Sequence, residues 1–322
     1  MALALESFRE KEERVDSAAF QRRFDAAFQN IASVVVASEV TIRLALLGLF
    51  AGGHVLLEDK PGVGKTLLAK TLAQSIEGAF TRVQFTPDLL PSDITGSSIF
   101  NPKDNRFDFI LGPIFTNILL ADELNRSNPR TQSALLEAMA ESQVTADGVS
   151  RPLPAPFMVI ATQNSLDSSG TFPLPDTELD RFLVRISIGM PSPKDEMEIL
   201  RRSEHDQPAV EPVLTCPQVR AMQAYVRQVQ VATPVKEYLI RISGAVRSHP
   251  QVRRGVSPRG TVALQRAAQG WAAINGRDFA TPDDVQAVAA SVIAHRIGAG
   301  DETGGHSIAV VREALESVPV PL

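Results

Sequence analysis

The sequence predicts an α/β protein, with a five-stranded parallel sheet in its first domain and a smaller, all-helical second domain. Short apolar runs alternate with helical or long loop segments up to about residue 190, as parallel strands require. A glycine-rich loop separates the first of these strands from a helix, and beyond residue 190 the apolar spacing becomes helical. A chain of 322 residues also exceeds the usual size of a single core. We therefore expect domains at residues 1–190 and 191–322.

The individual elements follow from local patterns. Two helices are expected at residues 16–31 and 40–50, with Ser38 as the N-cap of the second. The strands are expected at residues 54–58, 82–85, 117–121, 157–161 and 184–188. After a linker at residues 190–193, helices are expected at residues 194–204, 215–229, 235–248, 258–274 and 282–296. The glycine-rich tract at residues 298–305 is expected to form a loop.

Composition and charge exclude several classes of protein. Hydrophobic residues make up 44% of the chain and charged residues 21%, which fits a globular protein and not a disordered one. The formal net charge of −5 lacks the basic excess that sequence-independent binding of nucleic acid needs. Cys216 is the single cysteine, and the sequence shows neither a secretory signal nor an apolar run of membrane-spanning length. We therefore expect a cytoplasmic protein without a membrane span.

A phosphate-binding loop is indicated where PGVGKT, residues 61–66, follows a strand and opens a helix. Lys65 would meet the β and γ phosphates, and Thr66 would offer its hydroxyl to Mg²⁺. Asp59 stands where the general P-loop pattern has its first glycine, so a chance glycine-rich turn is the competing interpretation. The expected ATP contacts are Pro61, Gly62, Val63, Gly64, Lys65, Thr66 and Leu67.

Two adjacent acids end the apolar strand ILLADE. Asp122 would hold the Mg²⁺ shell together with Thr66, while Glu123 would orient or deprotonate the attacking water. An acidic helix cap after a strand is the competing interpretation. The pair indicates a nucleotide-hydrolysing site that depends on ATP and Mg²⁺.

Asn164 ends a later strand, in the stretch VIATQN. Ligand sites in open α/β sheets lie at the carboxyl ends of strands, so Asn164 would lie near the γ phosphate and position the water. A turn-forming asparagine explains this residue equally well. Strand position alone does not decide between the two interpretations.

With these elements in this order, the chain resembles the AAA+ superfamily, and longer stretches resemble the MoxR-type ATPases of its helix-2-insert clade. MoxR-like proteins often carry aspartate at the position of Asp59. The resemblance implies an AAA+ P-loop domain followed by a helical lid. The similar stretches are LLEDKPGVGKTLLAKTLA from Leu56, QFTPDLLPSDITG from Gln84, GPIFTNILLADELNRSNPRTQSALLEAMAE from Gly112, VIATQN from Val159, FPLPDTELDRF from Phe172 and SPRG from Ser257.

The resemblance also implies roles for single residues. Lys65 and Thr66 would be the Walker A contacts, Asp122 and Glu123 the Walker B pair, and Asn164 the sensor-1 residue. Two catalytic arginines would complete the site.

Arg181, in ELDRF, resembles the arginine finger that reaches a neighbouring subunit's γ phosphate, and Arg259, in SPRG, resembles the sensor-2 arginine of the lid. An ordinary surface salt bridge is the competing interpretation for each arginine. Arg126 is a further arginine that could reach nucleotide across the interface.

Two insertions are expected from the same resemblance, one at about residues 96–113 and the other a hairpin near residues 143–156. Phe100, Phe107 and Phe109 in the first insertion could grip a substrate. Packing of these rings against their own domain is the competing interpretation.

The resemblance implies an oligomeric, chaperone-like ATPase, forming a hexameric ring that remodels or matures a protein client together with a von Willebrand factor A domain partner. A nucleic-acid-remodelling AAA+ motor is the alternative function, although the acidic charge balance disfavours it. A P-loop kinase and a non-hydrolysing nucleotide-bound scaffold are further alternatives, and the Asp122-Glu123 pair disfavours both.

Overall fold

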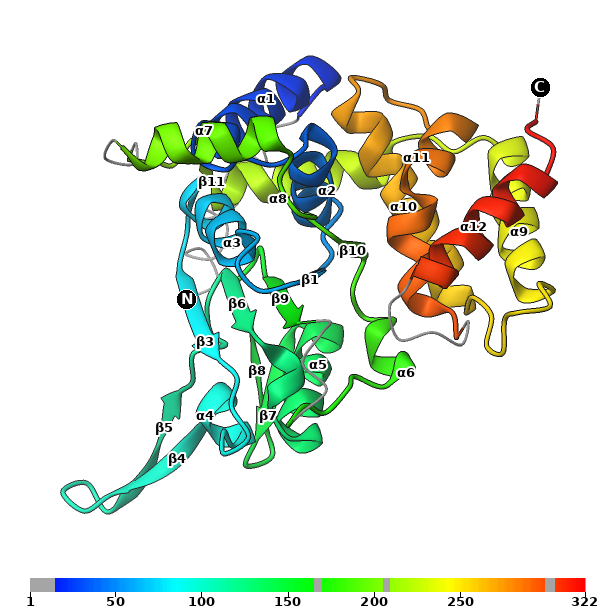
Figure 1. The fold of residues 1–322 in the computed structure, drawn as a ribbon. Coiled ribbons are helices and arrows are strands. Elements are labelled where there is room, and N and C mark those ends of the chain that lie inside the picture. Colours follow the sequence, from blue (N-terminus) through cyan, green and yellow to red (C-terminus); the bar gives the residue numbers. More distant parts are fainter. Residues whose placement is uncertain (1–14, 165–169, 205–208, 299–304, 322) are drawn as a thin grey trace, which may run out of the picture.

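A five-stranded parallel sheet forms the centre of the first half of the chain (Figure 1). The computed structural model describes residues 15–164, 170–204, 209–298 and 305–321. The sheet has the order β10-β1-β9-β6-β3, and every neighbouring pair is parallel. Its strands are β1 (Val55–Asp59), β3 (Phe80–Gln84), β6 (Ile118–Asp122), β9 (Met158–Asn164) and β10 (Val184–Ile186). The five expected strands are thereby confirmed.

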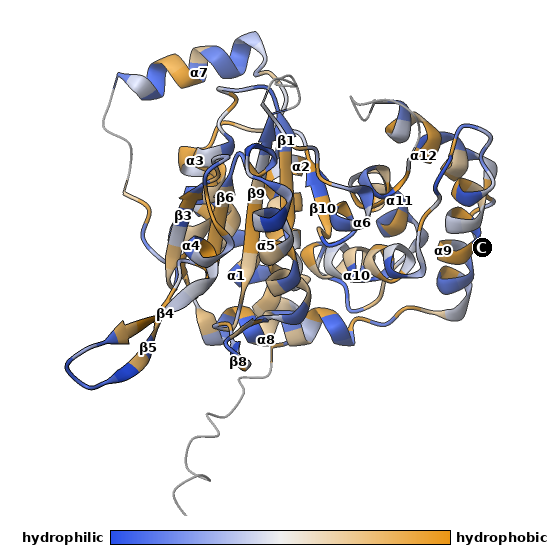
Figure 2. Cartoon of the chain, turned by 90° about the horizontal axis from the view of Figure 1, so that it is seen from below, coloured by the Kyte–Doolittle hydropathy of each residue, from blue (hydrophilic) through white to orange (hydrophobic). Residues whose placement is uncertain are grey.

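Helices cover both faces of this sheet (Figure 2). Leu57 and Leu120 face a core shared with Leu68 of α3 (Lys65–Gln74), whereas their neighbours Leu56 and Leu119 face a second core. Alternation of side chains along a strand produces these two cores. The first core includes residues of α1 (Ser17–Val34) and α2 (Glu39–Phe50), and the second includes residues of α5 (Pro129–Glu141).

The expected N-terminal helices are present and capped. Asp16 accepts a hydrogen bond from the N–H of Ala19 at the start of α1, and Ser38 accepts one from Thr41 at the start of α2. Such caps satisfy N–H groups that the helix itself leaves without partners. The expected N-cap Ser38 is therefore confirmed.

Two hairpins occupy the expected insertions. The first, β4 (Gly96–Asn101) and β5 (Arg106–Leu111), follows the short helix α4 (Pro91–Thr95) and projects from the body (Figure 1). The second pairs β7 (Gln143–Ala146) with β8 (Val149–Pro152). Small connecting elements are β2 (Ile76–Glu77), η1 (Leu124–Arg126) and α6 (Asp176–Leu179).

The three phenylalanines of the first hairpin divide between the two expected environments. Phe100 and Phe107 are 47% and 71% exposed, with ring centroids 5.3 Å apart. Phe109 instead packs edge-on against Phe115 and beneath the guanidinium of Arg151, which lies 3.7 Å from its ring centroid. Phe109 therefore fastens the base of the hairpin, while the other two rings are presented to solvent.

Among the described residues beyond β10, the regular elements are helical apart from β11 (Leu214–Thr215), which pairs with β2. The helical elements are α7 (Pro193–Ser203), α8 (Cys216–Gln228), α9 (Thr233–Arg247), α10 (Pro258–Ile274), α11 (Pro282–Ile293), η2 (Ala294–Arg296) and α12 (Gly305–Ser317). The sequence patterns did not predict α12, whose N-terminus borders the glycine-rich tract. Most of that expected loop lies outside the described residues.

One hydrophobic core connects the sheet with the later helices, since it runs from Phe20 in α1 through Leu57 in β1 to Leu264 in α10 and Val310 in α12. The division at residue 190 stays a prediction. Among the described residues, no helix is both long and apolar enough to cross a membrane.

At Gly270, α10 packs tightly against α2. A Cβ built at this position would lie 2.4 Å from Cδ1 of Leu47 and 3.5 Å from Cβ of Ala51. Both neighbours are buried and cannot move freely in a close-packed core. Glycine is therefore required where these two helices cross.

We expect Gly270→Ala to lower the free energy of unfolding by about 1–3 kcal/mol, because overpacking strains the contact between α10 and α2. Urea denaturation of the purified chain measures this change. Gly244→Ala in α9 is the matched control, since a Cβ there meets nothing within 4 Å. The free energy of unfolding of this control should rise by roughly 0.5–1 kcal/mol. Equal stability of the two variants would contradict the steric argument.

Candidate nucleotide site

The carboxyl ends of the central strands meet at one edge of the sheet. Asp59 lies opposite Asn164 in the register of β1 with β9, and Gln84 lies opposite Asp122 in the register of β3 with β6. The glycine-rich loop directly follows β1, and Glu123 directly follows β6. At this edge the sheet brings together five of the predicted site residues: Lys65, Thr66, Asp122, Glu123 and Asn164.

The glycine-rich loop has room for an anion. Gly62 and Gly64 have φ angles of 84° and 94°, which residues with a Cβ rarely adopt. A Cβ at either position would meet no atom within 4 Å. Among the described residues no side chain caps α3, so its first N–H groups can face a phosphate. Pro61 is exposed, Val63 is half-buried, and Leu67 packs against the core.

The Lys65 ammonium is held by three acceptors. Its Nζ donates to the carbonyl oxygens of Asp59 and Gln163 at 2.7 and 2.8 Å, and to Oδ1 of Asn164 at 2.7 Å. Burial lowers the pKa of Lys65 from its usual value, and four nearby carboxylates, Asp59 foremost, oppose that shift. The lysine is therefore ordered by strand ends of the same sheet.

Asn164 connects Lys65 to Glu123. While its Oδ1 accepts from the ammonium, its Nδ2 donates to Oε1 of Glu123 at 3.1 Å. Oε2 of Glu123 accepts from Nε2 of Gln84 at 2.8 Å and from Nη1 of Arg126 at 2.9 Å. Glu123 also has a φ of 56°, a conformation that is uncommon outside glycine and clusters at functional sites. Strong local constraints thus fix this carboxylate.

Asp122 accepts hydrogen bonds on both carboxylate oxygens and is 7% exposed. The Thr162 hydroxyl donates to Oδ1 at 2.6 Å and accepts from the N–H of Glu123 at 2.8 Å. Oδ2 lies 3.5 Å from Oγ1 of Thr66, and Arg82 donates to the same oxygen at 2.7 and 3.0 Å. A carboxylate beside a hydroxyl is the kind of oxygen-ligand set that Mg²⁺ accepts together with phosphates.

Sequence patterns did not single out Arg82, Gln84 or Thr162. Arg82 and Gln84 lie two apart on β3, and Thr162 lies two before Asn164 on β9. Residues two apart on a strand share a face of the sheet. That spacing is the signal that could have found them, once β3 and β9 were known to flank β6.

Asp59 has a structural reason to differ from the general P-loop pattern. Its Oδ2 accepts from the hydroxyl of Ser187 at 3.0 Å and from the N–H groups of Ile188 and Gly189 at 2.5 and 3.0 Å. A glycine could not make these bonds. The carboxylate therefore ties the start of the phosphate loop to the linker that leads from β10 to α7.

The structure does not bring Arg181 and Arg259 to the edge of the sheet where the other five predicted site residues meet. Nη1 of Arg181 donates to the carbonyl of Leu136 in α5 at 2.9 Å, and the side chain is half-buried. Arg259 is exposed in the first turn of α10. Within the described part of the chain, neither arginine has a hydrogen bond or ion pair to the strand-edge residues. A hydrogen bond from Ser257 to Asp180 joins the two segments that carry these arginines.

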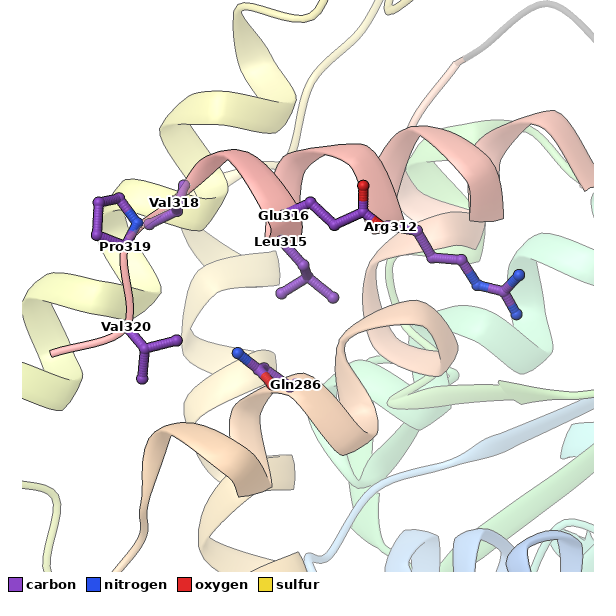
Figure 3. A pocket seen from close by; sticks show the side chains of 7 residues that line it. All are labelled: Gln286, Arg312, Leu315, Glu316, Val318, Pro319 and Val320. Carbon is purple, nitrogen blue, oxygen red and sulfur yellow. The ribbon is translucent and has the colours of Figure 1, made fainter.

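A cavity of about 490 Å³ lies elsewhere, between α11, α12 and the C-terminal segment (Figure 3). Leu315 points into it from α12 and faces Gln286 of α11, with Val320 of the C-terminal segment at its side. The lining is shared between apolar and charged side chains. It contains none of the predicted site residues.

A glycine loop between strand and helix, an Asp-Glu pair at the end of a buried strand two positions away in the sheet and a helical second part together define a P-loop nucleotide-binding protein. Two family profiles match the chain. The ATPase family associated with various cellular activities (AAA) matches residues 54–184, and the AAA lid domain matches residues 244–314.

Relatives extend the similarity over nearly the whole chain. The chain is 46% identical to the uncharacterized protein YeaC of Bacillus subtilis, over 92% of this chain and 94% of that protein. It is 37% identical to Chaperone MoxR1 of Mycobacterium tuberculosis, over 92% of this chain and 82% of that protein. A crystal structure from Cytophaga hutchinsonii, described as a candidate ATPase, aligns with a TM-score of 0.85 at 34% identity, covering 99% of this chain and 100% of that one. The chain belongs to the MoxR-type AAA+ ATPases.

We expect Asp59→Gly, which restores the general P-loop glycine, to retain nucleotide binding while loosening the linker. Lys65 bonds the backbone carbonyl of residue 59, which the substitution keeps, whereas the N–H groups of Ile188 and Gly189 lose their acceptor. Hydrogen exchange at these two amides should accelerate at least roughly tenfold, since charge-assisted bonds are worth about 1.5–3 kcal/mol.

Asp59→Asn is the matched control because its amide oxygen can still accept. Exchange at the amides of Ile188 and Gly189 should then accelerate less than in Asp59→Gly, because the neutral oxygen still accepts but gives weaker bonds than the carboxylate. Unchanged exchange in Asp59→Gly would show that the carboxylate does not hold the linker.

Proposed function

We propose that this MoxR-type chain hydrolyses ATP in a Mg²⁺-dependent reaction, as an oligomer whose sites are completed by neighbouring subunits. The bridge of Asn164 between the Lys65 ammonium and the Glu123 carboxylate is the observation that carries this proposal. It joins the residue suited to bind phosphate with the residue suited to activate water. The bridge shows that the two residues lie close together, and a hydrolytic site needs this closeness because both groups must act on the same phosphoryl group.

Binding of the nucleotide rests on the loop and on three side chains. The N–H groups of the loop and of the first turn of α3 would surround the phosphates, and Lys65 would exchange its present acceptors for phosphate oxygens. Thr66 and Asp122 fit Mg²⁺, which is usually held by one or two protein ligands together with phosphate oxygens. When bound, Mg²⁺ supplies neutralisation of the charge that develops on the phosphates.

Glu123 is suited to orient the attacking water and accept its proton. Gln84 and Asn164 fix its two oxygens from opposite sides, so the carboxylate has a defined direction. The Thr162 hydroxyl holds the backbone N–H of Glu123 and the carboxylate of Asp122 together. A positioned general base contributes about 10²–10⁴-fold to such a reaction.

Arg181 and Arg259 are assigned to a neighbouring subunit's site. Their separation from the strand-edge residues supports this assignment, since neither contacts that set within the described residues. An arginine supplied by another subunit stabilises transition-state charge and makes hydrolysis depend on assembly. Arg126 pairs with Glu123 of its own subunit, which favours a role within that subunit.

The wider role that we propose is chaperone-like remodelling or maturation of a protein client. One similar protein bears the name Chaperone MoxR1, and the family resemblance extends the proposal to a hexameric ring that acts with a von Willebrand factor A domain partner. The cytoplasm is the compartment that a single cysteine fits best. The domain division at residue 190 is part of the same proposal, with the second domain acting as the lid.

We expect Glu123→Gln to bind ATP like the parent chain while hydrolysing it at least roughly 100-fold more slowly, because only the proton acceptor is lost. Lys65→Ala should lose nucleotide binding. Titration with a fluorescent ATP analogue and phosphate release measure the two properties. The exposed residues Glu141 and Lys70 provide matched controls, since Glu141→Gln and Lys70→Ala should leave both properties unchanged. Parent-like hydrolysis by both site variants would refute the assignment.

Specific activity should rise with protein concentration, since each site needs a neighbour. Arg181→Ala should collapse hydrolysis at every concentration, by at least roughly 100-fold on the scale known for arginine fingers, without weakening ATP binding. Phosphate release and light scattering over the same concentration range measure activity and assembly. Concentration-independent hydrolysis that survives Arg181→Ala would instead indicate a self-contained site. Stimulation by added DNA would favour a nucleic-acid motor.

A further inference from the structure

The turn that carries Arg181 is fastened to the later helices. Oδ1 of Asp180 accepts from Nε of Arg296 in η2 at 2.8 Å, and Oδ2 accepts from the hydroxyl of Ser257 at 2.9 Å. Asp176 of α6 adds an ion pair with Arg254 at 3.4 Å. Figure 1 shows α6 lying between the sheet and the helices α10 to α12. The residue next to Arg181 is thus held by two side chains from that helical part.

Arg296 grips the backbone on both sides of Arg181. Its side chain is 2% exposed. Nη2 donates to the carbonyl oxygens of Asp180 and Phe182 at 3.3 and 2.5 Å, and Nη1 donates to that of Leu183 at 3.1 Å. Burial lowers the pKa of Arg296 to about 10, and Asp180 opposes the shift, so the guanidinium stays charged at neutral pH. One cation therefore fixes residues 180, 182 and 183 together.

The same carboxylate also reaches the turn of Arg259. Ser257, which donates to Asp180, is the N-cap of α10 and accepts from the N–H of Gly260 at 3.0 Å. Arg259 lies between Ser257 and Gly260 in the sequence, and its positive charge contributes to lowering the pKa of Arg296. Asp180 is consequently the shared partner of the two segments that carry Arg181 and Arg259.

We propose that Asp180 and Arg296 are positioning residues that fix Arg181 and Arg259 as one unit, so that both arginines are presented together to a neighbouring subunit. The proposal rests on the function proposed above. Within the described residues, the hydrogen-bond partners of Asp180 and Arg296 do not include the strand-edge residues of the candidate site. A change at Asp180 should therefore damage the site of the neighbour and spare the site of its own subunit.

A mixing experiment separates these two effects. Asp180→Ala subunits should keep Lys65 but misplace Arg181, whereas Lys65→Ala subunits should lack a working site but keep both arginines in place. The two variants are co-expressed with different tags, and mixed rings are purified through both tags. Asp180→Ala alone should hydrolyse ATP at least roughly tenfold more slowly than the parent, with an unchanged dissociation constant for ATP. In a 1:1 mixture, activity per Asp180→Ala subunit should recover to about half of the parent value, because half of its neighbours are intact donors.

Arg181→Ala mixed with Lys65→Ala tests the proposed function itself and should recover in the same way. Glu178→Ala is the matched control in the same segment, because its carboxylate bonds Ser133 of α5 and not the later helices. That variant should hydrolyse ATP like the parent.

Recovery with Arg181→Ala but not with Asp180→Ala would overturn the positioning role and leave the proposed function standing. Recovery with neither would overturn both, and parent-like activity of Asp180→Ala alone would also overturn the inference. If Asp180→Ala fails to bind ATP, Asp180→Asn takes its place. The asparagine removes the negative charge, but its amide oxygen can still accept a hydrogen bond from one of the two donors. It should lose less activity alone and recover in the same mixture, and no recovery would overturn the role.

Discussion

The parallel register of β1 against β9 and of β6 against β3 is the constraint on which this site depends. Of these strands, β1, β6 and β9 are largely buried, and a slip by one residue would turn every one of their side chains to the opposite face. The apolar cores on the two faces therefore fix the register. Because the register is fixed, Asp59, Asn164 and Asp122 reach the same edge without any long-range polar contact having to select it.

An acidic edge that binds a polyanion needs its own charges compensated. Each carboxylate at this edge is already paired: Glu58 with Arg185, Asp122 with Arg82, Glu123 with Arg126, and Asp59 with backbone N–H groups. Leaving any of these acids without a partner in a half-buried position would raise the cost of bringing phosphates nearby. Because these pairs compensate the negative charges, Lys65 can bind an anion although four carboxylates lie near it.

The sequence patterns predicted the five strands and most helices because each leaves a local apolar signature. The predicted ends were less accurate. β9 continues from the predicted end at residue 161 to Asn164, since polar residues there still pair with β1. Helix α12 went unpredicted beside the glycine-rich tract. At the site, GKT and the Asp-Glu pair are local patterns, whereas Arg82 and Thr162 act across strands and only the assembled sheet brings them to Asp122.

Arg296 shows the same limit at longer range. It lies more than a hundred residues from Asp180 in the chain, and no local pattern marks its guanidinium as buried. Its partners are mostly backbone carbonyls, which any residue type supplies. Contacts of this kind depend on tertiary packing, so no spacing of residues in the sequence predicts them.

The hairpin of β4 and β5 is anchored near its base, where Phe109 stacks against Arg151 and Ser98 bonds Asp147, which lies in the turn of the second hairpin. Six paired residues span roughly 20 Å. From the anchored pair Ser98 and Phe109 to the last pair, Asn101 and Arg106, the ribbon runs roughly 10 Å, so a tilt of about 10° about the anchor moves that end by roughly 2 Å. Small rearrangements beneath Phe109 would therefore be passed on to the aromatic pair of Phe100 and Phe107, which lies two residues beyond the anchor and would move by roughly 1 Å for the same tilt.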